Sequence, residues 1–229
     1  MSAILELEKV VKTYKKGTNE VHALAGMDLS IDEGEFMAVV GPSGSGKTTL
    51  LNIVGCLDSP TSGTVRYKGA ALGGMKENQL SDYRKEHISF IFQSYNLIPV
   101  LTVRENVELP LVIDRKLEKE AIRARAEEVL AAVGLKGLED RYPRELSGGQ
   151  EQRVAIARAL VKDPYIVLAD EPTANLDSHT AQEIIDIMKE INRTHNATFI
   201  FSTHDALVQQ HARRVVTIRD GAIHSDERK

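Results

Sequence analysis

The chain has 229 residues, with 29 basic and 33 acidic side chains and a formal net charge of -4. This length suits one large α/β domain with a sub-lobe, so we treat residues 1–229 as a single domain. The near balance of charge argues against a nucleic-acid partner, and no apolar run approaches the roughly 18–20 residues that cross a bilayer.

Two further features concern the compartment. The only cysteine, Cys56, cannot form an internal disulfide, and residues 1–6 lack the basic and then apolar form of a signal peptide. We therefore expect a cytoplasmic chain without direct membrane insertion. If it works at a membrane, another polypeptide must supply the span.

Five strands are predicted along the chain. Residues 4–12 and 21–31 mix apolar and polar side chains, which predicts antiparallel strands exposed on one face. Residues 36–40, 166–169 and 198–202 are short apolar runs, typical of central parallel strands buried on both sides. Ligands of open α/β sheets bind beyond the carboxyl ends of such strands, so the residues that follow these runs should meet in one crevice.

A glycine-rich loop follows the first apolar run. It fits the pattern G-x-x-x-x-G-K-[ST], in which backbone N–H groups approach phosphates, the lysine reaches the β/γ oxygens and the hydroxyl binds Mg²⁺. A glycine-rich surface turn is the alternative, but the strand before the loop and the helical run 49–54 after it favour a phosphate site. The loop consists of Gly41, Pro42, Ser43, Gly44, Ser45, Gly46, Lys47 and Thr48.

Helices are predicted between the first two apolar runs. Residues 117–133 are good helix formers with apolar positions near the 3.6 period, and Gly134 is a plausible C-cap. Residues 154–160 also predict a helix. Residues from about 94 to 162 therefore form a candidate helical subdomain inserted in the core.

The other two apolar runs end in titratable residues. Asp170 could hold Mg²⁺ through water, and Glu171 could orient or activate an attacking water. Adjacent acids after a strand are more often a solvated turn or a helix cap, but the phosphate loop favours catalysis. His204 follows the third run and could bind the γ-phosphate. A lone histidine is usually a surface or packing residue, and only the strand-end position argues otherwise.

A second glycine motif, Leu146-Ser147-Gly148-Gly149-Gln150, lies about a hundred residues after the first. The N–H groups and dipole of the helix that follows would attract phosphate, although Ser147 could simply be an N-cap. One phosphate loop with two candidate γ-phosphate sites suggests that two chains complete each other's sites.

These motifs resemble the nucleotide-binding subunit of an ATP-binding-cassette transporter over essentially the whole chain. Residues 146–150 match the signature motif of that family residue for residue. The resemblance implies an ATPase that uses ATP and Mg²⁺ and is built on a P-loop core with a mostly parallel central sheet. It also implies an N-terminal antiparallel β subdomain, an inserted α-helical subdomain and a sandwich dimer of two copies.

The same resemblance assigns roles to single residues. Tyr14 would stack on adenine rather than fill a gap in the core, and Gln93 would touch Mg²⁺ and water rather than only solvent. Asp177 would belong to the D-loop that contacts the nucleotide. The catalytic residues would be Lys47, Glu171 and His204. The metal ligands would be Thr48, Gln93 and Asp170. The phosphates would be bound by residues 41–49, including Thr49, together with Ser147, Gly148, Gly149 and Gln150.

The segments 89–99 and 169–177 resemble the branch that serves lipoprotein-releasing and macrolide-exporter systems. Ala174 and Glu151 depart from that branch, which commonly has glycine and often glutamine there. The implied partner is an integral membrane permease subunit, and export is the expected process. An ATPase that drives transmembrane signalling without moving a substrate is the alternative. A soluble cassette acting on DNA or ribosomes is less favoured, because such relatives carry a long coiled coil or two cassettes in one chain, and this sequence has neither.

The loop 95–103 is unusually apolar. Exposed apolar patches tend to mark interfaces, so we expect Leu97, Ile98 and Leu101 to line a groove for a cytoplasmic helix of the membrane partner. Packing of this loop under the helical subdomain is the alternative.

Overall fold

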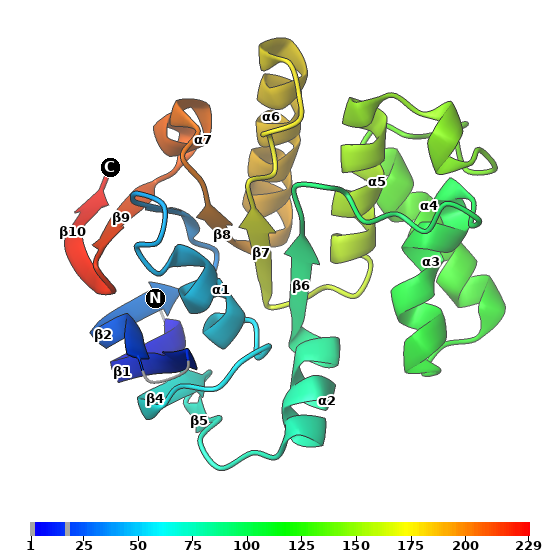
Figure 1. Cartoon of the computed structure of the whole chain (residues 1–229). Helices are drawn as coiled ribbons and strands as arrows, with labels where there is room; N and C mark the ends of the chain where they lie inside the picture. Colours follow the sequence, from blue (N-terminus) through cyan, green and yellow to red (C-terminus); the bar gives the residue numbers. More distant parts are fainter. Residues whose placement is uncertain (1–2, 17–18) are drawn as a thin grey trace.

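The computed structural model describes residues 3–16 and 19–229 (Figure 1). It contains two β-sheets, with a group of helices set to one side of both. Among the described residues, no helix combines the length and the apolar character needed to span a membrane.

The first sheet is antiparallel, with the strand order β2-β1-β4-β5. Its first two strands pair along most of their length, which confirms the antiparallel strands predicted over residues 4–12 and 21–31. The strands of this sheet are β1 (Ala3–Lys16), β2 (Asn19–Asp32), β4 (Ser62–Tyr67) and β5 (Ala70–Ala71).

The second sheet has the order β10-β9-β3-β8-β7-β6 and is parallel except at its β10 edge. The three predicted apolar runs are its neighbouring central strands β3, β8 and β7, so their carboxyl ends lie side by side, as predicted. The strands of this sheet are β3 (Phe36–Val40), β6 (Ile88–Ile91), β7 (Ile166–Asp170), β8 (Thr198–Ser202), β9 (Arg214–Arg219) and β10 (Ala222–Arg228).

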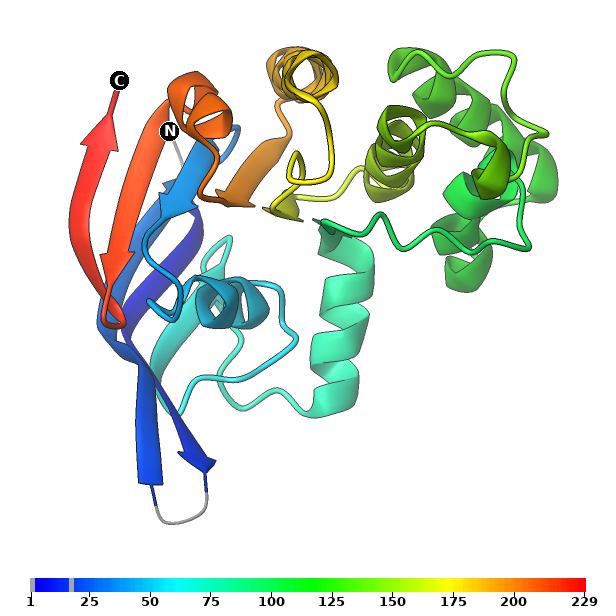
Figure 2. The same cartoon turned by 45° about the horizontal axis from the view of Figure 1, so that its top comes forward.

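Both faces of the parallel sheet are covered, which explains its unbroken apolar strands. Phe36 and Ala38 face a core shared with α6 and the helical region, whereas Met37 and Val39 face a core shared with α1 and the first sheet. Figure 2 shows α6 and α7 on one side of the strands and α1 on the other. These helices are α1 (Lys47–Val54), α2 (Glu77–His87), α6 (Ser178–His195) and α7 (Ala206–His211).

The chain between β6 and β7 is helical and lies to one side of both sheets (Figure 1). The helix predicted over residues 117–133 is α4, and the one predicted over 154–160 begins earlier, at Gly148. The first helix of the region was not predicted. The region contains α3 (Val103–Asp114), α4 (Lys119–Ala132), the 3₁₀ turn η1 (Pro143–Glu145) and α5 (Gly148–Leu160).

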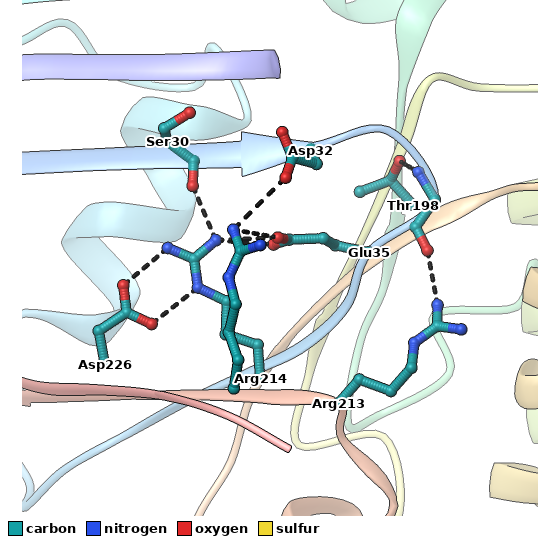
Figure 3. Close-up of polar contacts among 9 residues, drawn as sticks. Ser30, Asp32, Glu35, Thr198, Arg213, Arg214 and Asp226 are labelled. Atoms are coloured by element: carbon teal, nitrogen blue, oxygen red, sulfur yellow. Dashed lines mark hydrogen bonds and ion pairs between the residues drawn. The ribbon is translucent and has the colours of Figure 1, made fainter. Parts of the chain in front are cut away.

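A buried arginine joins the two sheets (Figure 3). Arg214, at the start of β9, is paired through two nitrogens with both carboxylate oxygens of Asp226 on β10, at 2.8 and 2.7 Å. Its remaining nitrogen donates to Glu35, at 2.9 Å, and to the carbonyl of Ser30 on β2, at 2.7 Å. The C-terminal hairpin is therefore tied to the antiparallel sheet by charge as well as by packing.

Candidate functional site

A cavity of about 680 Å³ lies at the carboxyl ends of β3, β7 and β8. It contains most of the residues that the sequence predicted to meet there, although they come from three distant parts of the chain. The predicted residues that line it are Gly41, Pro42, Ser43, Gly44, Gly46, Lys47, Thr48, Thr49, Asp170, Glu171 and His204.

The glycine-rich loop forms one wall of this cavity and leads directly into α1. Gly46 adopts φ 107° at the start of the helix, and a Cβ there would collide with the carbonyl of Ala23, so only glycine fits. The side chain of Ser45, in the same loop, is buried, and its hydroxyl has no hydrogen-bond partner among the residues that the structure describes. The ammonium group of Lys47 donates to the carbonyls of Gly41, at 2.8 Å, and Pro42, at 3.0 Å. A loop of this shape presents backbone N–H groups, a helix N-terminus and a cation to an anion.

The acidic wall is built from the ends of β7 and β8. Asp170 is the last residue of β7, and Glu171 follows it with φ 46° and donates its N–H to the carbonyl of Ser202. The Glu171 carboxylate accepts hydrogen bonds from the Thr203 hydroxyl, at 2.9 Å, and from Nδ1 of His204, at 2.5 Å. Glu171 begins a turn, since its carbonyl accepts the N–H of Ala174, but its side chain is only 16% exposed and is held by the two residues that follow β8.

Thr203 follows the third apolar run and was predicted to lie near the crevice, but no role was predicted for it. It is fully buried, and while its hydroxyl donates to Glu171 it accepts the N–H of Asp205. Its position directly after the third apolar run was the available signal. Three neighbours on β2, Val21, His22 and Ala23, also line the cavity, and nothing in their residue types indicated it.

Tyr14 lies on β1 near this cavity without lining it. Its ring is exposed rather than filling a gap in the core, and its hydroxyl donates to Asp58 at 2.7 Å. Burial and this hydrogen bond raise the pKa of Tyr14. The ammonium group of Lys12 lies 4.9 Å from the ring centroid, so one side of the ring is occupied by a cation.

Two residues predicted to touch the nucleotide do not line the cavity. Gln93 is exposed, and its carbonyl accepts a hydrogen bond from the side chain of Asn175 at 2.9 Å. Asp177 is the N-cap of α6 and accepts from the N–H groups of His179 and Thr180, both at 3.0 Å. Their predicted contacts with the nucleotide stay predictions.

The second glycine motif also lies outside the cavity. Ser147 is the N-cap of α5, as its alternative interpretation predicted, and forms a capping box with Gln150. Gly148 and Gly149 are the first two residues of the helix. A Cβ on Gly149 would collide with the methyl group of Thr180 on α6, so close packing alone requires glycine there.

Glu151 adds an acidic group to the first turn of α5. Burial raises its pKa, because water no longer fully solvates the charged carboxylate. A carboxylate at this point interacts favourably with the helix dipole but would repel a phosphate brought to the same N-terminus.

The cavity has oxygen donors suited to a hard cation. The Thr48 hydroxyl and the Asp170 carboxylate both line it, whereas Gln93 does not. Mg²⁺ in phosphate-binding sites is typically held by one or two protein oxygens, with phosphate and water oxygens completing the octahedron. No group of three or more His, Cys, Asp or Glu side chains in the described parts of the chain could hold a metal by itself. The donor set therefore fits Mg²⁺ bound together with a phosphate.

The apolar loop 95–103 before α3 is partly packed against the helical region and partly exposed. Leu97 packs against the buried core of the helical region, so the packing alternative holds for this residue. Ile98 and Leu101 are half-buried, whereas 77% of Val100 is exposed. The exposed apolar surface of this loop is therefore centred on Val100.

The comparisons with known proteins agree with this geometry. The family model described as "ABC transporter" matches residues 24–174. The chain is 44% identical over 226 residues to a macrolide export ATP-binding/permease protein, MacB, of Mannheimia succiniciproducens, covering 99% of this chain but 35% of that protein. It is 40% identical to the bacitracin export ATP-binding protein BceA of Halalkalibacterium halodurans, covering 99% of this chain and 89% of that protein.

A third relative also has a solved structure. The chain is 44% identical to the ABC transporter ATP-binding protein MJ0796 of Methanocaldococcus jannaschii, covering 98% of this chain and 97% of that protein. A structure described as a dimeric post-hydrolysis state of MJ0796 bound to ADP and Pi superposes with a TM-score of 0.88 at 43% identity, over 98% of both chains. The predicted fold class is therefore confirmed, with its parallel core, antiparallel sheet and helical region.

Proposed function

This chain belongs to the ABC transporter family as an ATP-binding and ATP-hydrolysing cassette, and we propose that it drives a membrane permease subunit in export. Export appears in the names of the macrolide and bacitracin relatives. The chain spans about a third of the macrolide protein, which is an ATP-binding and permease protein in one. A separate permease subunit would then hold this chain on the inner face of the membrane.

One observation carries the proposal: Lys47 and Glu171, from distant parts of the chain, line the same cavity. The lysine and the N–H groups of the loop would bind the β- and γ-phosphates and neutralise the charge that develops on them. The Glu171 carboxylate would orient the attacking water and accept its proton. Because Thr203 and His204 already hold that carboxylate, little reorganisation is needed when the nucleotide binds.

Thr48 and Asp170 would hold Mg²⁺, which supplies charge neutralisation between the phosphates. The threonine follows the lysine on α1, and the aspartate ends β7, so two rigid elements present the two oxygens. Gln93 would approach the metal only if its segment moved toward the cavity. This difference between fixed and movable ligands suits a site that senses the nucleotide.

The functional unit in this proposal is a dimer of two copies. Ser147 and Gly149 stand at the N-terminus of α5, outside the cavity of their own chain, so they are free to face the γ-phosphate bound by a second copy. The dimeric state named for the MJ0796 structure supports the same arrangement. Each cavity would then be complete only when the two chains meet.

A mixing experiment tests the composite site. Ser147→Arg should leave the ATP affinity of the monomer little changed but abolish hydrolysis, because the side chain fills the space meant for the other copy's γ-phosphate. Lys47→Ala should be inactive for the opposite reason. A mixed dimer of the two variants pairs one intact site with one doubly defective site, so it should recover some activity. Full ATPase activity of Ser147→Arg alone would contradict the composite site.

A further inference from the structure

Asp58, in the loop after α1, binds two side chains of a distant strand. Its carboxylate accepts a hydrogen bond from the Tyr14 hydroxyl, at 2.7 Å, and pairs with the ammonium group of Lys12, at 2.5 Å. Both partners belong to β1 and lie 44 and 46 positions away in the sequence. Although burial opposes the shift, hydrogen bonds from Lys12 and Tyr14 lower the pKa of Asp58. A charged carboxylate therefore holds both side chains.

The backbone around Asp58 is fixed as well. The N–H groups of Leu57 and Asp58 donate to the carbonyl of Asn52, in the last turn of α1, at 2.8 and 3.2 Å. The ammonium group of Lys12 also donates to the carbonyl of Ser59, at 2.8 Å. The helix whose first turn faces the cavity is thus joined to β1 through the loop that follows its last turn.

Tyr14 lies beside the cavity on the side of β2. It pairs across the sheet with Val21, and the side chains of directly paired residues project from the same face. Val21 lines the cavity. Burial and Asp58 raise the pKa of Tyr14, whereas the side chain of Thr49, which also lines the cavity, lowers it. The Tyr14 hydroxyl therefore lies close to Thr49.

The cavity leaves one place for the base of a nucleotide. In the proposed function the phosphates lie along the glycine-rich loop, and the γ-phosphate lies beside Glu171. Apart from this loop, the start of α1 and the chain around the ends of β7 and β8, the lining consists of Val21, His22 and Ala23 of β2. The base then lies against β2, on the side of the cavity where Tyr14 is found.

The Tyr14 ring has one free face at this place. Tyr14 is 39% exposed, and the ammonium group of Lys12 lies 4.9 Å from the ring centroid. A cation over one face is attracted to the ring and leaves the other face for a planar ligand. Nucleobases stack on aromatic faces whatever their hydrogen-bonding pattern. The free face is therefore suited to a base.

We propose that Asp58 is a positioning residue that fixes the Tyr14 ring as a stacking surface for the base of the nucleotide. Its hydrogen bond to the hydroxyl sets the rotation of the ring, and its ion pair places Lys12 over one face. Because Asp58 is bound to the last turn of α1, these contacts also fix the ring relative to the phosphate loop at the start of that helix. The role of Asp58 rests on the proposed function, in which the phosphates lie between Lys47 and Glu171.

Asp58→Ala is the test, with Asp114→Ala as its matched control. Asp114 is the last residue of α3 and also binds a lysine, Lys85, at 2.9 Å. Its side chain is 22% exposed, against 29% for Asp58, and it does not line the cavity. A general effect of losing a half-buried ion pair would appear in both variants, whereas loss of the positioned ring would appear only in Asp58→Ala.

ADP binding is measured by isothermal titration calorimetry with Mg²⁺ present, because ADP carries the base and is not hydrolysed during the titration. Asp58→Ala should weaken ADP binding about fivefold. It should also raise KM for ATP while kcat changes little, because stacking contributes equally before and during the reaction. In a Tyr14→Ala chain the same substitution should weaken ADP binding no further, since the ring that Asp58 positions is already gone. Asp114→Ala should match the unaltered chain.

Tyr14→Phe keeps the test decisive if Asp58→Ala does not fold, because it removes only the hydroxyl and should weaken ADP binding about twofold. ADP affinity at the unaltered level in Asp58→Ala, or in Tyr14→Phe where only that variant folds, would overturn the proposal. A fivefold loss that persists in the Tyr14→Ala chain, or that Asp114→Ala reproduces, would also overturn it. If the unaltered chain binds no ADP, the proposed function itself fails, whereas ADP binding that does not depend on Asp58 removes only the positioning role.

Discussion

Arg214→Met should destabilise the protein more than any other single change in the charged cluster of Figure 3. The Arg214 side chain is 7% exposed, and those of its partners Glu35 and Asp226 are 12% and 37% exposed. Methionine keeps the apolar stem but leaves both carboxylates without their main cation. Breaking a fully buried pair costs about 3–5 kcal/mol. We expect about 3 kcal/mol, since Asp226 can reach water and Arg228 still contacts Glu35.

Thermal unfolding measures this effect. For a domain of this size, about 3 kcal/mol lowers the melting temperature by roughly 6–12 °C. Arg228→Met is the control, because the Arg228 side chain is 62% exposed and its loss should cost less than about 1 kcal/mol. Equal melting temperatures for the two variants would show that the buried arginine does not hold the sheets together.

Three further predictions concern other parts of the chain. Arg214 holds the pKa of Asp226 below its usual range. The stability that this carboxylate contributes is therefore present above about pH 4 and is lost as the pH falls through its native pKa. Asp226→Asn should unfold more easily than the unaltered protein at pH 7, and the difference in stability between the two should vanish in acid titrations. Leu97→Ser should lower the melting temperature because it leaves a cavity, whereas Val100→Ser should spare the melting temperature and weaken pull-down of the proposed membrane partner. Gly149→Ala should destabilise the contact between α5 and α6 and lower the melting temperature. Adding Thr180→Ser to that variant removes the colliding methyl group and should restore the melting temperature. An unrestored melting temperature would show that the collision with Thr180 is not the cause.

The central strands were open to prediction because both of their faces are buried. Phe36, Met37, Ala38 and Val39 divide between two separate cores, and this leaves an unbroken apolar run in the sequence. The glycine-rich loop was equally visible, because its residues are contiguous and each has a local task. Helix α6 also carries a helical pattern, with Ile184, Met188 and Ile191 on one face, although we did not predict it.

Other features depend on contacts between distant residues. No side chain of α2 is fully buried. Its apolar residues Leu80 and Tyr83 are partly buried against the core, and two such positions give only a weak helical pattern in the sequence. Arg214 binds Glu35 and Ser30 across 179 and 184 positions, and a charged residue at a strand start does not reveal such partners. The same holds for Asp58, since its partners on β1 lie 44 and 46 positions away.

The site residues at strand ends could be predicted, whereas contacts between their side chains could not. Asp170, Glu171 and His204 follow apolar runs, so their meeting could be predicted from parallel order alone. The role of Thr203 depends on the rotation of its side chain toward Glu171. The place of Ser147 outside its own cavity became visible only once α5 was placed in the fold.

ATP turnover by Glu171→Gln, measured beside ATP binding, tests the central claim most directly. Glutamine keeps the shape of the side chain but cannot accept a proton from water, and it leaves the proposed nucleotide and metal ligands Lys47, Thr48 and Asp170 unchanged. The variant should bind ATP as the unaltered protein does, hydrolyse almost none and accumulate as an ATP-bound dimer. Turnover within about threefold of the unaltered protein, roughly 0.7 kcal/mol in barrier, would contradict the catalytic role of this carboxylate.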